Sequence, residues 1–317
     1  RYFDAALRPY WRRNGRDAAD LIAAAAKDFA RLSIECADFD REVMADLTRI
    51  GGPAFAQIGA LAYRQAFAGN KLAAAANGAP LLFRKENLSN GCIATVDVLY
   101  PMMPIFYAFS PALVRASLVP VLDYAASPRW KFDYAPHDLG RYPHATGQVY
   151  GGGERSDDRQ MPVEESANMI LLLAGLAKVD GKLDLAGRYW PQLEKWARYL
   201  EQKGFDPENQ LCTDDFTGHL AHNVNLSAKA IVALGAYAQL CGQRKLAAEA
   251  ARLRTLAQQF AARWTKEAAS GDRYRLAFDQ PATWSQKYNL VWDRVLGLGL
   301  FDAATLRREM DFYLKTQ

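Results

Sequence analysis

The chain has 317 residues, of which 50% are hydrophobic and 23% charged. This composition excludes an intrinsically disordered chain, and the length is sufficient to bury a large core without disulfides or metals. The formal net charge of +4 is too small to indicate binding to nucleic acid. No stretch approaches the roughly 20 apolar residues that a membrane-spanning helix needs, so we expect no nucleic-acid partner and no membrane span.

Amphipathic helices separated by loops rich in glycine, proline or aspartate make up most of the sequence. Leu21, Ala25, Phe29 and Leu32, for example, recur at helical spacing. In chain order we expect helices over residues 17–32, 53–67, 96–109, 111–126, 162–178, 183–203, 220–240, 245–266 and 302–314. Short strands are indicated only over residues 81–85 and 273–278. The predicted fold class is therefore all-α.

Three connections are longer than the roughly 2 to 8 residues typical of helical bundles. They cover residues 127–161, 204–218 and 271–289, and they are rich in polar and aromatic side chains. Helices that alternate between short connections and long polar ones predict an array of hairpins with a site built at one end. This pattern favours a toroid of paired helices, an (α/α) barrel, over a four-helix bundle.

Several common catalytic motifs are missing from the sequence. It contains no G-x-x-x-x-G-K-[ST], G-x-G-x-x-G, G-x-S-x-G, S-x-x-K or H-E-x-x-H pattern. The four cysteines are widely spaced and contain no C-x-x-C, so they predict neither a zinc knuckle nor a disulfide framework. Carboxylates, four histidines and aromatic loops remain as candidates, and we expect no metal and no cofactor.

Six acidic residues lie at the predicted junctions between long loops and helices: Asp97, Asp138, Glu164, Glu165, Asp214 and Asp215. Hydrolysis of a glycosidic bond needs one protonated carboxyl group and one ionised carboxylate. Hydrolysis of an amide can also use a carboxylate to activate water. Both reactions require surroundings that push two carboxyl pKa values apart.

Structural interpretations compete at each of these positions. Glu164 and Glu165 follow Pro162, as acidic residues do at a helix N-terminus. Asp214 and Asp215 could serve as turn residues, and Asp138 could form a loop ion pair with His137. His219 and His222 would share a helical face if the helix began near Thr217, which allows a metal site, although hydrogen-bonded structural histidines are the favoured interpretation.

Five segments, in order along nearly the whole chain, resemble the central domain of the glutaminase A family. They are residues 87–100 (NLSNGCIATVDVLY), 135–143 (APHDLGRYP), 161–168 (MPVEESAN), 214–226 (DDFTGHLAHNVNL) and 283–293 (TWSQKYNLVWD). The resemblance implies an (α/α)6 toroid of helical hairpins similar to six-hairpin glycosidases, either complete or incomplete in this chain. It also implies a secreted or periplasmic protein, and a longer polypeptide with a covalently attached N-terminal β-rich domain.

Two hydrolytic activities follow from this resemblance. The family name implies hydrolysis of the L-glutamine amide to glutamate and ammonia, whereas the architecture and the HDLG and EES loops are similar to those of two-carboxylate glycosidases. A cysteine nucleophile at Cys92 or Cys212 and a non-catalytic carbohydrate-binding toroid remain as alternatives. The expected partner is a small-molecule substrate, either glutamine or a saccharide.

We therefore expect residues 1–317 to form a single helical domain. We expect one pocket, at a mouth of the toroid. The expected catalytic residues are Glu165, Asp214, Asp215 and Asp138, with Glu165 and Asp214 or Asp215 as the acid–base pair. The expected substrate-binding residues are Asp97, His137, Arg141, Glu164, Trp284, Lys287, Tyr288, Asn289, Asn87 and Asn90. Arg141 or Lys287 would hold the α-carboxylate of glutamine.

Overall fold

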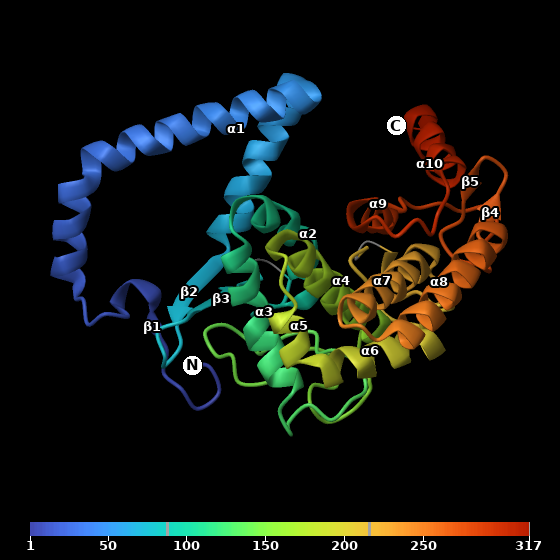
Figure 1. Cartoon of the computed structure of the whole chain (residues 1–317), viewed down its shortest axis with the longest axis horizontal. Helices are drawn as coiled ribbons and strands as arrows, with labels where there is room; N and C mark the ends of the chain where they lie inside the picture. Colours follow the sequence, from blue (N-terminus) through green and yellow to red (C-terminus); the bar gives the residue numbers. More distant parts are fainter. Residues whose placement is uncertain (87–88, 215–216, 317) are drawn as a thin grey trace.

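The computed structural model describes residues 1–86, 89–214 and 217–316, and it confirms the predicted all-α class with few short strands (Figure 1). The α-helices are α1 (Ala18–Ala68), α2 (Val96–Phe109), α3 (Pro111–Ala125), α4 (Pro162–Asp180), α5 (Asp184–Arg188), α6 (Trp190–Lys203), α7 (Val224–Gln243), α8 (Ala247–Glu267), α9 (Val291–Leu296) and α10 (Ala303–Thr316). Two short 3-10 helices are η1 (Tyr10–Arg12) and η3 (Tyr288–Leu290).

Paired helices form an inner and an outer layer. Consecutive helices pack as the hairpins α2–α3, α4–α6 and α7–α8, and the inner helices α2, α4 and α7 also contact one another in that order. Helices α4 and α7 are buried along almost their whole length, whereas α6 and α8 bury one face. An outer helix needs only one apolar face, which explains the amphipathic sequences of α6 and α8.

Helix α7 forms the centre of this core. By length and composition it could cross a membrane, but 94% of its apolar window is buried inside the protein. Its neighbours α4 and α8 make extensive contact with it on separate sides (Figure 1). The apolar sequence of α7 is therefore accounted for by packing within the protein.

A small antiparallel sheet flanks the helices, in the order β1 (Arg8–Pro9), β2 (Asn70–Ala74) and β3 (Pro80–Arg84). The predicted strand over residues 81–85 corresponds to β3, in which Leu82 pairs with Leu72 of β2. The second predicted strand, residues 273–278, is shorter than expected. Only β5 (Arg273–Tyr274) is extended there, paired with β4 (Ala269–Ser270).

The two predicted helices before the sheet are parts of the longer α1. Asp17 begins this helix with a capping box, in which its side chain accepts from the Asp20 amide at 2.9 Å. Gly52 then adopts a φ of +82°, which interrupts the helical path before Pro53. The first arm of α1 projects away from the hairpins (blue in Figure 1) and leaves many apolar side chains exposed.

Two other helix boundaries differ from the prediction. Helix α7 begins at Val224 rather than at residue 220, because the Asn223 side chain caps the Leu226 amide at 2.9 Å. The helix predicted over residues 183–203 is divided at Tyr189 into α5 and α6, with Pro191 in the first turn of α6.

The core position of α7 leads to a stability prediction. Leu234 on α7 is fully buried, whereas Leu314 on α10 is 78% exposed. We expect Leu234→Ala to lower the free energy of unfolding by about 2–5 kcal/mol through a cavity, and Leu314→Ala to change it by less than about 0.5 kcal/mol. Chemical denaturation followed by circular dichroism measures both, and equal losses would contradict the placement of α7 in the core.

Candidate active site

Several inner helices begin where a long loop ends, and their first turns carry polar residues. Asp97 lies in the first turn of α2, Glu164 and Glu165 in that of α4, and Asn225 in that of α7. Direct contacts join these helix ends to η3. The Tyr100 hydroxyl of α2 donates to Asn289 Oδ1 at 2.8 Å, and Asn289 Nδ2 donates to the Asn225 carbonyl at 3.0 Å.

A histidine lies between two carboxylates at this end of the helices. His137 Nδ1 is 3.0 Å from Asp138 Oδ2, and His137 Nε2 is 3.7 Å from Asp97 Oδ1. One ligand atom from each of Asp97, His137 and Glu165 lies within 4.8 Å of the others. Tyr150 stacks on the imidazole, with ring centroids 4.0 Å apart. We call Asp97, His137, Asp138 and Glu165 the acid–histidine cluster.

Asp138 is held by backbone amides as well as by His137. Its Oδ1 accepts from the amides of Gly140 at 2.7 Å and Val149 at 3.1 Å, and its Oδ2 accepts from that of Tyr150 at 3.1 Å. Gly140 has a φ of +130°, and a Cβ there would lie 2.3 Å from the His144 carbonyl oxygen, so only glycine fits this turn. The loop therefore fixes the Asp138 carboxylate, which in turn orients His137.

The pKa of His137 is set by opposing effects. Burial lowers the pKa of the imidazole, but the negative charges of Asp97 and then Asp138 outweigh burial and raise it above its ordinary value. The surroundings therefore favour the imidazolium form of His137.

Glu164 and Glu165 are adjacent and fully buried, but they have different hydrogen-bond partners. Glu164 Oε1 lies 2.5 Å from Lys229 Nζ and also accepts from the hydroxyl and amide of Thr213 and from Asn168. Glu165 Oε2 accepts from Asn168 Nδ2 at 3.1 Å, and neither Glu165 Oε1 nor Glu164 Oε2 has a hydrogen-bond partner among the described residues. Burial first, and then the charges of Asp97 and Glu164, raise the pKa of Glu165 well above its ordinary value.

Asp214 approaches the same network from the loop before α7. Its Oδ2 accepts from Asn225 Nδ2 at 3.2 Å. Burial raises the pKa of Asp214, and the hydrogen bond from Asn225 and the charge of Lys229 oppose this rise. Two other residues of the predicted site, Asp215 and Asn87, lie outside the described residues.

The remaining predicted binding residues have varied surroundings. Asn289 contacts the helix ends as described above, and Tyr288 is one of the groups that oppose the rise in the pKa of Asp214. Burial is the main cause that raises the pKa of the Tyr288 hydroxyl, followed by the charges of Glu164 and Asp214. Asn90 accepts from the Cys92 amide at 2.8 Å within its own loop, and Arg141 is exposed.

The other two predicted binding residues, Lys287 and Trp284, contact the last part of the chain. Lys287 Nζ donates to the carbonyl and hydroxyl of Ser285, at 2.6 and 3.1 Å, and to the Tyr274 carbonyl at 3.2 Å. Burial lowers the pKa of Lys287 to about 8. Trp284 packs edge-on against Phe312 of α10. The amine of Lys287 therefore already has three protein acceptors.

Polar residues that sequence reasoning missed complete the network: Asn168, Thr213, Asn225, Tyr100 and Lys229. Lys229 offered the clearest signal, because a lysine within an apolar helix is rarely buried without a partner. Asn168 and Asn225 lay inside the quoted motifs, but sequence spacing gave no indication of which carboxylates they contact.

Among the described residues, two groups of side chains are spaced as metal ligands would be. Asp97, His137 and Glu165 form one group, and Cys92, His137 and Asp138 form the other. Burial raises the pKa of the Cys92 thiol, as do the charges of Asp138 and Glu86, so a thiolate ligand or nucleophile is disfavoured there. The first group could hold a divalent cation, but a proton on Glu165 relieves the same crowding of negative charge.

The other histidines considered for a metal do not share a helical face. Both precede α7, and His219 is exposed. His222 Nδ1 lies 2.8 Å from Asp206 Oδ1. The premise that the helix begins near Thr217 is therefore wrong.

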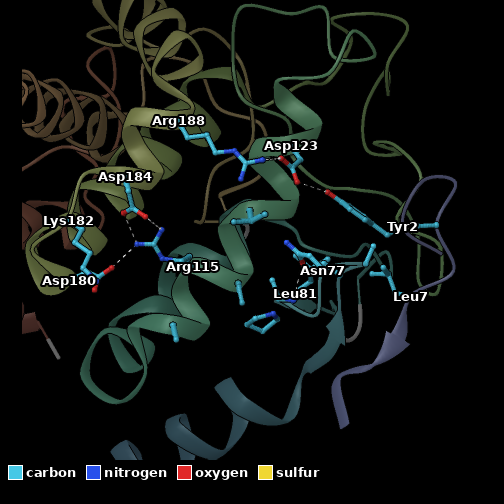
Figure 2. A pocket seen from close by; sticks show the side chains of 18 residues that line it. Tyr2, Leu7, Asn77, Leu81, Arg115, Asp123, Asp180, Lys182, Asp184 and Arg188 are labelled. Atoms are coloured by element: carbon cyan, nitrogen blue, oxygen red, sulfur yellow. Dashed lines mark hydrogen bonds and ion pairs between the residues drawn. The ribbon is translucent and has the colours of Figure 1, made fainter. Parts of the chain in front are cut away.

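A cavity of about 720 Å³ lies between the sheet and helices α3 and α5, away from these residues (Figure 2). Most of its charged side chains are paired with one another, and Lys182 also lines it. Arg115 contacts Asp180 and Asp184 at 2.7 and 2.8 Å, and Arg188 lies 3.6 Å from Asp123. The carboxylates of this cavity therefore lie beside arginines, unlike the acidic residues gathered at the helix ends.

Comparison with known proteins gives the same family as the motifs. Residues 52–317 match the family described as the glutaminase A six helical-hairpin domain. Glutaminase A of Aspergillus oryzae is 32% identical over 291 residues, covering 90% of this chain and 41% of that protein. Probable glutaminase/05536 of Arthroderma benhamiae is 24% identical over 351 residues, covering 92% of this chain and 40% of that protein. The chain thus spans about two fifths of the length of these relatives.

The support of Asp138 can be tested by Asp138→Asn. Both carboxylate oxygens of Asp138 now accept hydrogen bonds from backbone amides. In the asparagine variant an NH₂ group would replace one of these oxygens, so that at least one buried amide donor would lose its acceptor. We expect a loss of about 1–3 kcal/mol in the free energy of unfolding, measured by urea denaturation. Asp133→Asn is the matched control, because the Asp133 side chain is exposed and forms only a 3.6 Å surface pair with Lys195. Equal effects of the two substitutions would contradict the structural role of Asp138.

Proposed function

The chain belongs to the glutaminase A six helical-hairpin family, and we propose that it is a hydrolase that cleaves the side-chain amide of L-glutamine to glutamate and ammonia. The observation that carries the chemistry is a buried, unpaired Glu165 oxygen within the acid–histidine cluster. The names of the relatives support glutamine as the substrate.

We assign the acid–base roles from the relative pKa shifts. Glu165, whose pKa is raised well above its ordinary value, is the proton donor to the leaving amide nitrogen. Asp214, whose pKa rise is opposed by Asn225, Lys229 and Tyr288, is the base that removes a proton from the attacking water. The water oxygen bonds to the carbonyl carbon to give a tetrahedral intermediate, and the carbon–nitrogen bond then breaks as Glu165 gives its proton to the nitrogen, which releases ammonia and the side-chain carboxylic acid. Transfer of the proton from Asp214 back to Glu165 through solvent then restores both groups.

One end of glutamine has a complementary group in the cluster. Asp97, which retains some exposure, suits the α-ammonium group, whereas the two ring nitrogens of His137 already face Asp138 and Asp97. Glu164 and Glu165 have no exposed surface, so substrate entry must displace part of the layer of side chains that covers them.

Glycoside hydrolysis is the second candidate, and the state of the other cations favours it. Lys229 and Lys287 are committed to protein acceptors, and Arg141 is exposed. Of the cations predicted to hold an α-carboxylate, neither lies free in the network, whereas carboxylates and amides abound and bind sugar hydroxyls well. A glycosidase would use the same proton donor, Glu165, at the leaving oxygen.

Replacement of Glu165 tests the proton donor. We expect Glu165→Gln to lower kcat by about 10²–10⁴-fold while the fold is retained, since the amide keeps the shape and loses the proton. In the wild type, only protonated Glu165 can donate a proton. We therefore expect this group to support maximal kcat/KM below its raised pKa and kcat/KM to fall as the pH rises through that pKa. Glu208→Gln is the matched control on an exposed loop. Activity of Glu165→Gln near the wild-type level would contradict this role.

A substrate panel separates the two hydrolytic candidates. Ammonia release from L-glutamine is expected, with no reducing sugar released from a set of α- and β-glycosides. The reverse result would establish the glycosidase. Binding of saccharides without turnover, unchanged in Glu165→Gln and Asp214→Asn, would instead identify a carbohydrate-binding toroid.

A further inference from the structure

The imidazole of His137 is held so that one ring nitrogen faces further acidic groups. Its Nδ1 lies 3.0 Å from Asp138 Oδ2, and the Asp138 carboxylate is itself fixed by three backbone amides. Its Nε2 faces Asp97 Oδ1 at 3.7 Å, which is longer than a hydrogen bond. A carboxylate that fixes one nitrogen of a histidine, while the other nitrogen faces more ligands, is the support found behind metal-bound histidines.

Glu165 supplies an independent observation. Its side chain is fully buried, and its Oε1 has no hydrogen-bond partner among the described residues. One carboxylate oxygen of Glu165 lies within 4.8 Å of a ligand atom of Asp97 and of one of His137. A buried oxygen without a donor costs free energy, which a bound ion recovers.

Asp97, His137 and Glu165 match the ligand set of an open zinc site, which has three protein ligands and a further position for another molecule. Ligand atoms about 2.0–2.2 Å from a tetrahedral zinc ion lie about 3.4 Å from one another, so the 3.7 Å between His137 Nε2 and Asp97 Oδ1 is close to the required spacing. Even a pair at the 4.8 Å limit needs to close by only about 1.4 Å. The imidazole favours a transition metal over Mg²⁺ or Ca²⁺.

Charge balance favours a cation at the same position. Asp97 and Glu165 bring two carboxyl groups to one imidazole, so a divalent ion would leave this buried group without net charge. The overlapping group of Cys92, His137 and Asp138 is less suitable, because both Asp138 oxygens already accept from backbone amides.

We propose that Asp97, His137 and Glu165 form an inhibitory site for a divalent transition-metal ion such as Zn²⁺. The ion enters beside Asp97, whose side chain is 12% exposed. It binds one atom of each side chain and displaces to solvent any proton carried by His137 Nε2 or Glu165. Glu165 then has no proton to give to a leaving group. The inhibition rests on the proposed function, whereas binding of the ion does not.

Binding is measured first, without substrate. The whole chain carrying Cys36→Ser, which removes the exposed thiol, is freed of metal with a chelator and titrated with Zn²⁺ by isothermal calorimetry. We expect one ion per chain. Glu165→Gln and His137→Gln should each weaken binding by about 100-fold or more, since loss of an outer support such as Asp138 alone costs about 10–100-fold. Asp97→Asn, at the exposed edge of the group, decides the matter if the two buried variants do not fold.

The matched control is His222→Gln, which removes a surface histidine that lies 2.8 Å from Asp206. This exposed pair could bind Zn²⁺ adventitiously, and we expect its loss to leave the affinity of the proposed site unchanged. Affinity that is unchanged in folded Glu165→Gln and Asp97→Asn, or that is lost in His222→Gln, would overturn the proposal.

Ammonia release from L-glutamine separates failure of this inference from failure of the proposed function. We expect Zn²⁺ to reduce the release over the concentration range in which it binds, and a chelator to restore it. Binding that depends on Glu165 and Asp97, in a protein that releases neither ammonia nor sugar, would uphold the metal site and refute the hydrolase. Hydrolysis that persists with the ion bound would overturn the inhibitory role. Hydrolysis that requires the ion would also overturn the assignment of Glu165 as proton donor.

Discussion

The ion pair between Lys229 of α7 and Glu164 of α4 is the interaction on which the candidate site depends. It joins the two most buried helices at the point where the acidic residues gather. A buried charge without its partner is strongly destabilising, so each member of the pair fixes the other. Glu165, the next residue on α4, is also buried and accepts a hydrogen bond from Asn168. Its pKa is raised well above the ordinary value, mainly by burial.

The fold explains why so many polar groups can be buried together at one end. The first turn of a helix has free backbone amides and a partial positive charge, both of which stabilise carboxylates. Asp97 and the Glu164–Glu165 pair use such positions on α2 and α4, whereas Asp138 obtains equivalent amide donors from its own loop. Inner helices that start at a common end therefore supply both the framework and the electrostatic support for the cluster.

Much of the fold could be predicted because residues such as proline and glycine mark the ends of helices at their own positions in the sequence. The starts of α3 and α4 follow from Pro111 and Pro162, and the helix ending before Gly69 is also visible in the sequence. The strand β2 was not predicted, because its sequence NKLAA lacks β-branched and aromatic residues and its extended form depends on pairing with β3. The continuation of α1 between the two predicted helices was missed although Phe39, Val43, Leu47 and Ile50 recur there at helical spacing.

In the candidate site, too, the features with local causes could be predicted from the sequence, and those that depend on contacts between distant residues could not. Acidic residues at loop–helix junctions could be found from the sequence. The structural interpretation of Asp138 as the partner of His137 in a loop ion pair was also correct. Which donors surround each carboxyl group could not be found, because those contacts join residues 61 to 65 positions apart across two helices. Glu164 and Glu165 occupy equivalent sequence contexts, and only the approach of Lys229 to one of them makes their chemistry different. A helix dipole would favour ionisation of both carboxyl groups, but burial opposes it for Glu165 and raises the pKa of that residue well above its ordinary value, as a proton donor in hydrolysis of either an amide or a glycoside requires.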